Sequence, residues 1–308
     1  MSWSRLIRFV AQEDGKIYHG EPEQEGDLGL MYHSGERITA RLVSHPLAPQ
    51  PTRSSKVLTV KQLLSPLAPS DVPAIRGLGL QYAADPTSKA ASPPVLCLFF
   101  KPSTCISGPE AAIPLPDVAT DEKNDYEVEL CVVIGKPAKD VKAVDAMQHV
   151  AGFCVVNDVS SRGLCVKGGQ WGVGKSFDGR VACLARATGW CPIGPCIVAP
   201  NALGRDPHQL EITTRVNGNL VQQTSTKYLL ARIPEMIERL SHGATLESGS
   251  LILTGSPTAI GRKAPTEASS ESPFMRDGDE VRCYVEGCGT LINHVKAVRS
   301  PTARKAKL

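Results

Sequence analysis

Acidic and apolar residues alternate along residues 125–135, which read Asp-Tyr-Glu-Val-Glu-Leu-Cys-Val-Val-Ile-Gly. A period of two predicts a β-strand, because successive side chains of a strand point to opposite faces of the sheet. Glu127 and Glu129 would then share one face, about 6.5–7 Å apart. Two carboxylates held this close need a cation, unless the segment is an edge strand whose acidic face lies in water.

Other apolar runs predict a β-dominated chain with two or three helices and no internal repeat. The run that ends at Lys101 is expected to be a buried strand, and the run before Asn157 stops at a second polar pair, Asn157-Asp158. We expect strands over residues 6–10, 74–82, 95–101, 153–156 and 251–254, and helical segments near 60–64, over 144–150 and over 233–240.

The length of 308 residues allows one large domain or two. Residues 1–60 predict a small β-rich N-terminal domain that includes a proline-rich linker from Pro46 to Ser55. We expect a larger catalytic domain over 61–299 and a basic tail over 300–308.

The charge balance gives no basic footprint for nucleic acid, since 34 Lys and Arg face 31 Asp and Glu. The ten cysteines sit singly in apolar runs, and no signal peptide precedes them, which predicts a reduced, intracellular protein. The chain contains neither a C-x-x-C nor an H-x-x-x-H motif, so the sequence does not favour a zinc site. No apolar run approaches the ~18–20 residues of a membrane span, so we expect a soluble protein that acts on a small molecule.

Asp158 ends a strand of apolar residues, where a lone buried carboxylate is costly. A capping or turn role is the simpler interpretation of a single aspartate at such a place. Together with Glu127 and Glu129, however, it completes an all-oxygen set that suits Mg²⁺, Mn²⁺ or Ca²⁺ rather than zinc. The sequence does not choose among these ions, and availability favours Mg²⁺.

Residues 169–176 satisfy the pattern G-x-x-x-x-G-K-[ST], which in nucleotide hydrolases forms a phosphate-binding loop. That function requires an apolar strand just before the loop and a helix just after it. Here Arg162–Lys167 is polar and mixed, and Phe177-Asp178-Gly179 breaks any following helix. We interpret the match as accidental.

Five ordered motifs in this chain resemble those of the fumarylacetoacetate hydrolase superfamily, over roughly residues 73–298. Within it the chain looks closest to the branch that contains the eukaryotic fumarylacetoacetate hydrolase domain-containing proteins and the oxaloacetate tautomerases. The resemblance implies a mixed β-sandwich roll that usually dimerises and a metal held by Glu127, Glu129 and Asp158. The motifs are residues 125–136, 151–162, Gln170-Trp171 with 174–178, 216–218 with 221–222, and 253–257.

The same resemblance implies roles for further residues. Lys175 and Arg162 would hold the carboxylate or enolate of the substrate, although surface salt bridges remain an alternative for both. The substrate pocket would be completed by Tyr82, Lys101, Gln170 and Thr254. A 2-oxo or 1,3-dicarbonyl acid suits such a site, because it chelates a divalent ion that stabilises its enolate.

The chain departs from the family where hydrolases carry a histidine and a glutamate that activate water. Asp85 and Ser88 stand in their places, and general-base help is worth ~10²–10⁴ in rate. We therefore expect tautomerisation or decarboxylation of an oxaloacetate-like acid, with Asp85 as a weak substitute base. The alternatives are acylpyruvate-type C–C hydrolysis and an inactive member that serves as a binding subunit. A second departure is the extra segment from Arg180 to Trp190.

The last three residues, Ala306-Lys307-Leu308, resemble the Ser-Lys-Leu peroxisomal signal. Peroxisomal and cytosolic locations therefore both stay open.

Overall fold

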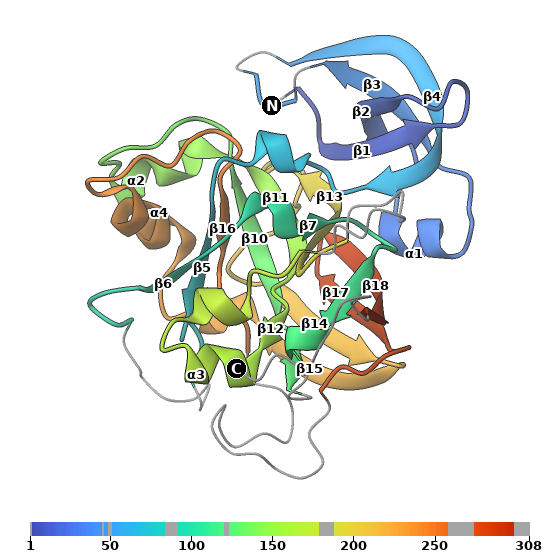
Figure 1. Cartoon of the computed structure of the whole chain (residues 1–308). Coiled ribbons are helices and arrows are strands. Elements are labelled where there is room, and N and C mark those ends of the chain that lie inside the picture. Colours follow the sequence, from blue (N-terminus) through green and yellow to red (C-terminus); the bar gives the residue numbers. More distant parts are fainter. Residues whose placement is uncertain are drawn as a thin grey trace.

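The computed structural model describes residues 2–44, 46–48, 51–83, 92–119, 123–178, 188–257 and 274–298. Figure 1 shows two β-sheets that pack against each other, with short helices at the periphery and the N-terminal strands gathered in one corner. This arrangement confirms the β-dominated α+β class with mixed sheets that the sequence predicted.

The larger sheet has eleven strands. Their order is β2 (Ile17–Pro22), β3 (Thr39–Ser44), β4 (Thr52–Leu64), β1 (Arg5–Ala11), β13 (Cys191–Val198), β11 (Val150–Asn157), β10 (Val128–Ile134), β16 (Leu251–Leu253), β5 (Ile75–Gly79) and β6 (Cys97–Lys101), with β7 (Ile106–Ser107) paired to β13.

The second sheet has five strands, in the order β15 (Asn219–Ser225), β14 (Glu211–Val216), β17 (Glu280–Val285), β18 (Gly289–Val298) and β8 (Ala112–Pro116). A short two-stranded ladder joins β9 (Asn124–Asp125) to β12 (Ser160–Ser161).

The helices are short. They are α1 (Leu28–His33), α2 (Ala143–Ala146), α3 (Arg162–Lys167) and α4 (Ile233–Ser241), with 3₁₀ turns η1 (Pro69–Asp71), η2 (Ser103–Cys105), η3 (Asp117–Ala119), η4 (Met147–His149), η5 (Trp171–Gly174) and η6 (Thr226–Tyr228). The amphipathic pattern over 233–240 correctly predicted α4, whose apolar residues are buried. Residues 144–150 form α2 and η4 and then enter β11.

Strand β10 lies in the interior of the large sheet, and each of its seven residues is buried. Val128 and Leu130 face a core shared with the second sheet, whereas Cys131 and Val133 pack into a separate core on the other face. Glu129 lies on the face of Cys131, as the period of two requires. The edge-strand interpretation is therefore wrong, because β11 and β16 pair with β10 on either side.

The N-terminal strands join the large sheet through β1. Leu6 pairs with Ile197 of β13, and residues 7–11 of the same strand pair with β2 and β4. Strand β4 runs from Thr52 to Leu64, so the expected domain boundary at residue 60 falls inside a strand.

Two expectations about secondary structure were wrong. Residues 60–64 belong to β4 rather than to a helix, because pairing with β1 overrides the local periodicity. Strand β6 ends on a buried Lys101, but it lies at the edge of the sheet, where Leu98 and Phe100 are 38% and 54% exposed. An apolar run in the sequence does not reveal whether a strand has neighbours on both sides or lies at the edge of the sheet.

Nine cysteines lie in the described part of the chain, and all nine are free thiols. Eight of them are buried, and only Cys97 on β6 is partly exposed. Among the described helices, none is both long and apolar enough to cross a membrane.

Candidate metal centre

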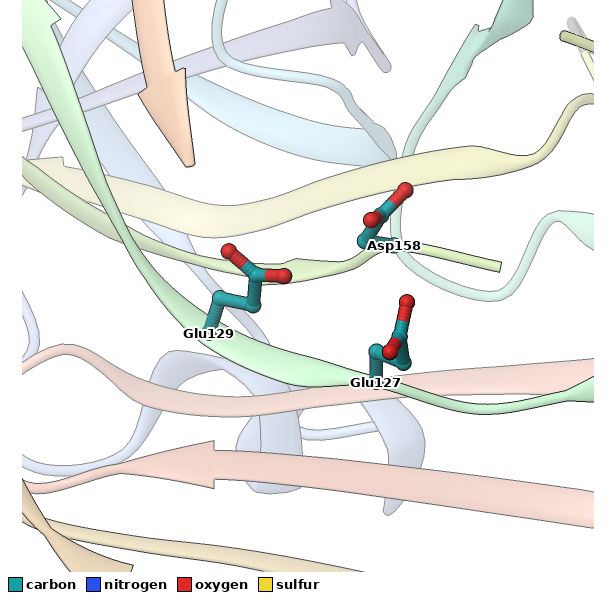
Figure 2. Close-up of side chains that lie close together, drawn as sticks. All are labelled: Glu127, Glu129 and Asp158. Atoms are coloured by element: carbon teal, nitrogen blue, oxygen red, sulfur yellow. The ribbon is translucent and has the colours of Figure 1, made fainter. Parts of the chain in front are cut away.

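Three carboxylates converge at one end of β10 and β11. Figure 2 shows the side chains of Glu127, Glu129 and Asp158 turned toward one another, and one oxygen from each lies within 4.8 Å of the other two. Glu129 is 2% exposed and Asp158 is fully buried. The convergence that the alternating pattern predicted for the two glutamates is confirmed.

Backbone pairing brings the two carrier segments into register. The N–H group of Asp158 donates to the carbonyl of Glu127 over 2.8 Å, and the N–H group of Glu127 donates to the Asn157 side chain over 3.0 Å. Residues 127 and 158 thus face each other just beyond the ladder of β10 and β11. The carboxylates are placed by the sheet rather than by a loop.

Two lysines approach Asp158. The Nζ of Lys101 lies 2.6 Å from Oδ1 of Asp158 and 3.1 Å from the carbonyl of Val159. The Nζ of Lys175 contacts Oδ2 of Asp158 and Oε2 of Glu127, and it lies 2.7 Å from Oγ of Ser160. Both lysine side chains are buried and paired within the cluster, so Lys175 does not form the surface salt bridge that was its alternative.

Arg162, the first residue of α3, has a partly exposed side chain that contacts Glu127. Its Nη2 is 2.5 Å from Oε1 of Glu127, and its Nε is 2.8 Å from Oδ2 of Asp125. The guanidinium fork is thus committed to two carboxylates of the protein. Its predicted contact with substrate stays a prediction.

Glu129 is the one clustered carboxylate for which the described residues supply no ion pair. Its Oε2 accepts the N–H group of Gly255 over 2.5 Å. Burial, followed by the charges of Asp158 and Glu127, raises the pKa of Glu129 well above its usual value. Burial also opposes the charge of Glu127, but Arg162 and Lys175 outweigh it and lower that pKa.

A divalent ion fits this donor set. All three groups offer hard oxygen ligands, and the charge of Glu129 is uncompensated in the interior, where an unpaired charge is costly. The residues present therefore agree with the metal class expected from the sequence.

A family model described as Fumarylacetoacetate (FAA) hydrolase C-terminal matches residues 76–296, which contain all three carboxylates and Lys175. The chain belongs to the FAA hydrolase family. The resemblance drawn from the sequence motifs is thereby confirmed.

Curated relatives of this family member are enzymes with different reactions. Caffeoylpyruvate hydrolase of Neonothopanus nambi is 34% identical over 96% of this chain and 94% of its own length. The mitochondrial oxaloacetate tautomerase FAHD2B of Bos taurus is 42% identical over 64% of this chain and 58% of its own. The chain thus aligns with little more than half of the tautomerase.

Solved structures share the fold along the whole FAA hydrolase-family chain. The 2-hydroxyhepta-2,4-diene-1,7-dioate isomerase of Mycobacterium marinum is 30% identical, with a TM-score of 0.74 over 99% of this chain and 100% of that one. The 5-carboxymethyl-2-hydroxymuconate delta-isomerase of Mycobacterium smegmatis is 31% identical, with a TM-score of 0.76 over 96% and 100%.

The predicted pocket residues of this family member occupy different places. The Tyr82 hydroxyl is buried and has no hydrogen-bond partner among the described residues, and burial and Glu129 raise its pKa. Thr254 donates to the carbonyl of Leu130 over 2.9 Å, which ties β16 to β10. Gln170 is exposed just before η5. Asp85 and Ser88 lie outside the described residues, so the altered dyad stays a prediction.

Sequence reasoning missed two polar residues of this site. Ser160 donates to Oε2 of Glu127 over 2.8 Å and contacts Lys175, and its position two residues after Asp158 was the available signal. Gln222 on β15 accepts the N–H group of Val128 and donates to the carbonyl of Pro257 over 2.7 Å. It joins the two sheets beside the carboxylates.

The residues of the apparent phosphate loop serve this site instead. Helix α3 and the turn η5 flank residues 168–170, so a helix rather than a strand stands immediately before the loop. Lys175 points to carboxylates, which agrees with the interpretation of the motif as accidental. Asp178, which precedes the extra segment, forms a β-bridge with Gly189 inside it, and residues 179–187 lie outside the described part.

Proposed function

We propose that this chain is a divalent-metal-dependent enzyme that forms the enolate of a 2-oxo acid. The proposed reaction is keto–enol tautomerisation, the reaction in the name of the oxaloacetate tautomerase relatives, or decarboxylation of an oxaloacetate-like acid. The observation that carries the proposal is the buried triad of Glu127, Glu129 and Asp158, in which Glu129 lacks an ion pair among the described residues.

The three carboxylates would hold the ion, and Mg²⁺ is our choice over Mn²⁺ and Ca²⁺, which accept the same donors. A bound Mg²⁺ supplies Lewis acidity, which polarises the oxygens of a 2-oxo acid and stabilises the charge of its enolate.

The protein's own residues position and balance these charges. Lys175 places its ammonium against Glu127 and Asp158, where it stabilises negative charge that develops on a substrate oxygen. Arg162 orients Glu127 through its planar guanidinium group, and Lys101 holds Asp158 through an ion pair with Oδ1. The Ser160 hydroxyl keeps Lys175 and Glu127 in one hydrogen-bonded group.

C–C bond hydrolysis of an acylpyruvate is the second candidate. The caffeoylpyruvate hydrolase match over 96% of the chain favours it. Asp85 and Ser88, in place of the expected histidine and glutamate, disfavour it. We expect the double change Asp85→His with Ser88→Glu to raise the rate of acylpyruvate cleavage, and an unchanged rate would count against the dyad argument.

The test is an assay of the purified protein with oxaloacetate and with acylpyruvates, in Mg²⁺ and in EDTA. We expect turnover of a 2-oxo acid in Mg²⁺, loss of turnover in EDTA and recovery when Mg²⁺ is restored. Fast cleavage of acylpyruvates by the wild-type protein would reverse our order of reactions. Calorimetry that shows tight Mg²⁺ binding without any turnover would instead support the inactive binding subunit.

We also propose a homodimer and peroxisomal import, each of which has a direct test. Light scattering of the purified chain gives its mass in solution, and a monomer would contradict the first. Deletion of Ala306–Leu308 from a fluorescently tagged chain should abolish a punctate cellular pattern, and an unchanged pattern would contradict the second.

A further inference from the structure

Phe99, which contacts Lys175, is paired with a second aromatic ring. The ring centroids of Phe99 on β6 and Trp171 in η5 are 6.0 Å apart, with the rings inclined at 59°. The Nζ of Lys175 lies 4.6 Å from the Phe99 centroid. The same ammonium therefore contacts the acidic cluster and the face of an aromatic ring.

Two glycines on β5 allow the rings to lie directly on its backbone. A Cβ at Gly77 would lie 2.0 Å from the Phe99 ring, and one at Gly79 would lie 1.9 Å from the Trp171 ring. Any larger residue would displace the rings, because real Cβ contacts are never this short. The glycines fix the position of both aromatic faces relative to Lys175.

The aromatic pair is not wholly interior. Phe99 is 5% exposed, whereas Trp171 is only partly buried, and the nearby Val173 is 55% exposed. The other two tryptophans, Trp3 and Trp190, are at most 1% exposed. Trp171 is thus the one tryptophan of this chain that is partly exposed.

The cationic side chains around the cluster have little charge left to pair with a second carboxylate on the substrate. Lys101, Lys175 and Arg162 are each paired with carboxylates of the protein already. A carboxylate at the far end of the substrate would meet the negative faces of Phe99 and Trp171, while an aryl group would pack on them edge-on or offset.

We propose that Phe99 and Trp171 form an apolar wall that receives an aryl or planar conjugated substituent of the 2-oxo acid. The inference rests on the proposed function for the position of the acid group. It moves the preferred substrate from oxaloacetate toward acids such as phenylpyruvate or benzoylpyruvate, whose ring lies beyond the enolate-forming carbon.

Kinetics of wall variants provide the first test. We measure kcat/KM for phenylpyruvate tautomerisation and for oxaloacetate tautomerisation in Mg²⁺, for wild type, Phe99→Leu and Trp171→Leu. The ratio of the two values should favour phenylpyruvate in the wild type and fall about tenfold in each variant, mainly through KM. An equal loss of kcat/KM for both substrates would contradict the proposed wall.

Phe100→Leu is the matched control. Phe100 follows Phe99 on the same strand, points to the opposite face and packs over Arg76, 5.9 Å from its guanidinium carbon. The phenylpyruvate-to-oxaloacetate ratio should stay at its wild-type value in this variant. A fall equal to that of Phe99→Leu would mean that damage to β6, rather than loss of the wall, lowers the ratio.

Tryptophan fluorescence tests the wall independently of turnover. Phenylpyruvate should quench the emission of the Mg²⁺-loaded wild type in a saturable way, oxaloacetate should quench it less, and Trp171→Phe should lose the effect. Quenching without turnover of any 2-oxo acid would retain the wall and reject the proposed function. Turnover of oxaloacetate without saturable phenylpyruvate quenching would reject the wall and retain the function.

Discussion

Glu129 differs from its two neighbours in how its charge is balanced. Glu127 is paired with Arg162 and Lys175, and Asp158 with Lys101 and Lys175, but Glu129 accepts only a backbone N–H group among its described contacts. Charge balance in the interior therefore depends on this one residue. A neutral side chain of the same shape isolates its contribution.

We expect Glu129→Gln to lower Mg²⁺ affinity by at least about a hundredfold, since the loss of even an outer-shell partner costs about 10–100-fold. The metal-free protein should not lose stability, because a glutamine oxygen can still accept the N–H group of Gly255 and the side chain has no charge to bury. Calorimetry measures the first effect and urea unfolding in EDTA the second. Glu25→Gln is the control, because the side chain of Glu25 is fully exposed.

At this scale the sequence predicted that Glu127 and Glu129 share a face, but it did not predict the partners of the clustered side chains. Alternation fixed the shared face of Glu127 and Glu129, because a strand leaves no other choice. The pairing of Lys101 with Asp158 joins residues 57 positions apart, and only the register of the sheet decides it. Thr254 stays a predicted pocket residue, and the sequence did not show that its hydroxyl donates to the carbonyl of Leu130.

Among the elements, β5 acts as a platform for the turn η5. The Trp171 ring lies on Gly79, so strand and turn are coupled through one contact. We expect Gly79→Ala to destabilise the fold by about 1–3 kcal/mol, because overpacking forces the ring to move.

Double-mutant unfolding in urea checks this coupling. Trp171→Leu should relieve the cost of Gly79→Ala, giving an interaction energy of about 0.5–3 kcal/mol. Gly172→Ala is the control, because its nearest neighbour would lie 3.5 Å from the new methyl group. Additive effects of Gly79→Ala and Trp171→Leu would contradict the packing argument.

A buried histidine, His208, contacts the first residue of helix α4. The Nε2 of His208 accepts the N–H group of Ile233 over 3.0 Å, and its Nδ1 lies 2.9 Å from Oδ1 of Asp206. Burial lowers the pKa of His208, and Arg232 adds to this against the opposing charge of Asp206. The neutral ring is therefore the form that caps the helix.

Because the folded pKa of His208 lies below the unfolded one, the unfolded chain takes up the proton first as the pH falls. The contribution of His208 to the free energy of unfolding should be complete above about pH 6.5. Below that pH it should decline by at most about 1.4 kcal/mol per pH unit. His208→Gln should flatten this slope in urea unfolding. His242→Gln, at an 88% exposed side chain, should keep the wild-type slope.

Helices and strands were predictable where the local pattern of apolar and polar residues, rather than pairing with distant segments, decides the structure. The amphipathic helix α4 and the strands β10 and β11 follow directly from periodicity. The helix expected near residues 60–64 failed, because β1 pairs with this segment as a strand. The exposure of β6 also depends on neighbours that the local sequence does not contain.

Across the whole molecule, the N-terminal strands are fastened to the second sheet as well as to the first. Asp27 caps α1 by accepting the N–H groups of Gly29 and Leu30, and it also accepts the N–H and hydroxyl groups of Thr290 on β18. One side chain therefore joins residues 263 positions apart.

We expect Asp27→Ala to lower the free energy of unfolding by about 2–4 kcal/mol, since it removes a helix cap and two long-range hydrogen bonds. Urea unfolding should show a single transition with a lower midpoint. Glu25→Ala should leave the midpoint in place. Two separate transitions in the wild type would mean that the N-terminal strands unfold independently.

At the largest scale the family motifs predicted the class of fold, and the β-dominated composition agreed with it. The sequence did not show how the first 60 residues attach, because the pairing of Leu6 with Ile197 joins segments about 190 positions apart. The N-terminal domain boundary stays a prediction, with β4 continuous across it.

Cys97 pairs with Gly79 in the ladder of β6 and β5, and it is the only partly exposed thiol among the described cysteines. Once Cys183, which lies outside that part, is replaced by serine, a maleimide reagent should modify this one position in the native protein. An environment-sensitive dye attached there would sit next to the strand on which Trp171 rests. Ligand entry could then be followed in real time, without a chromogenic substrate.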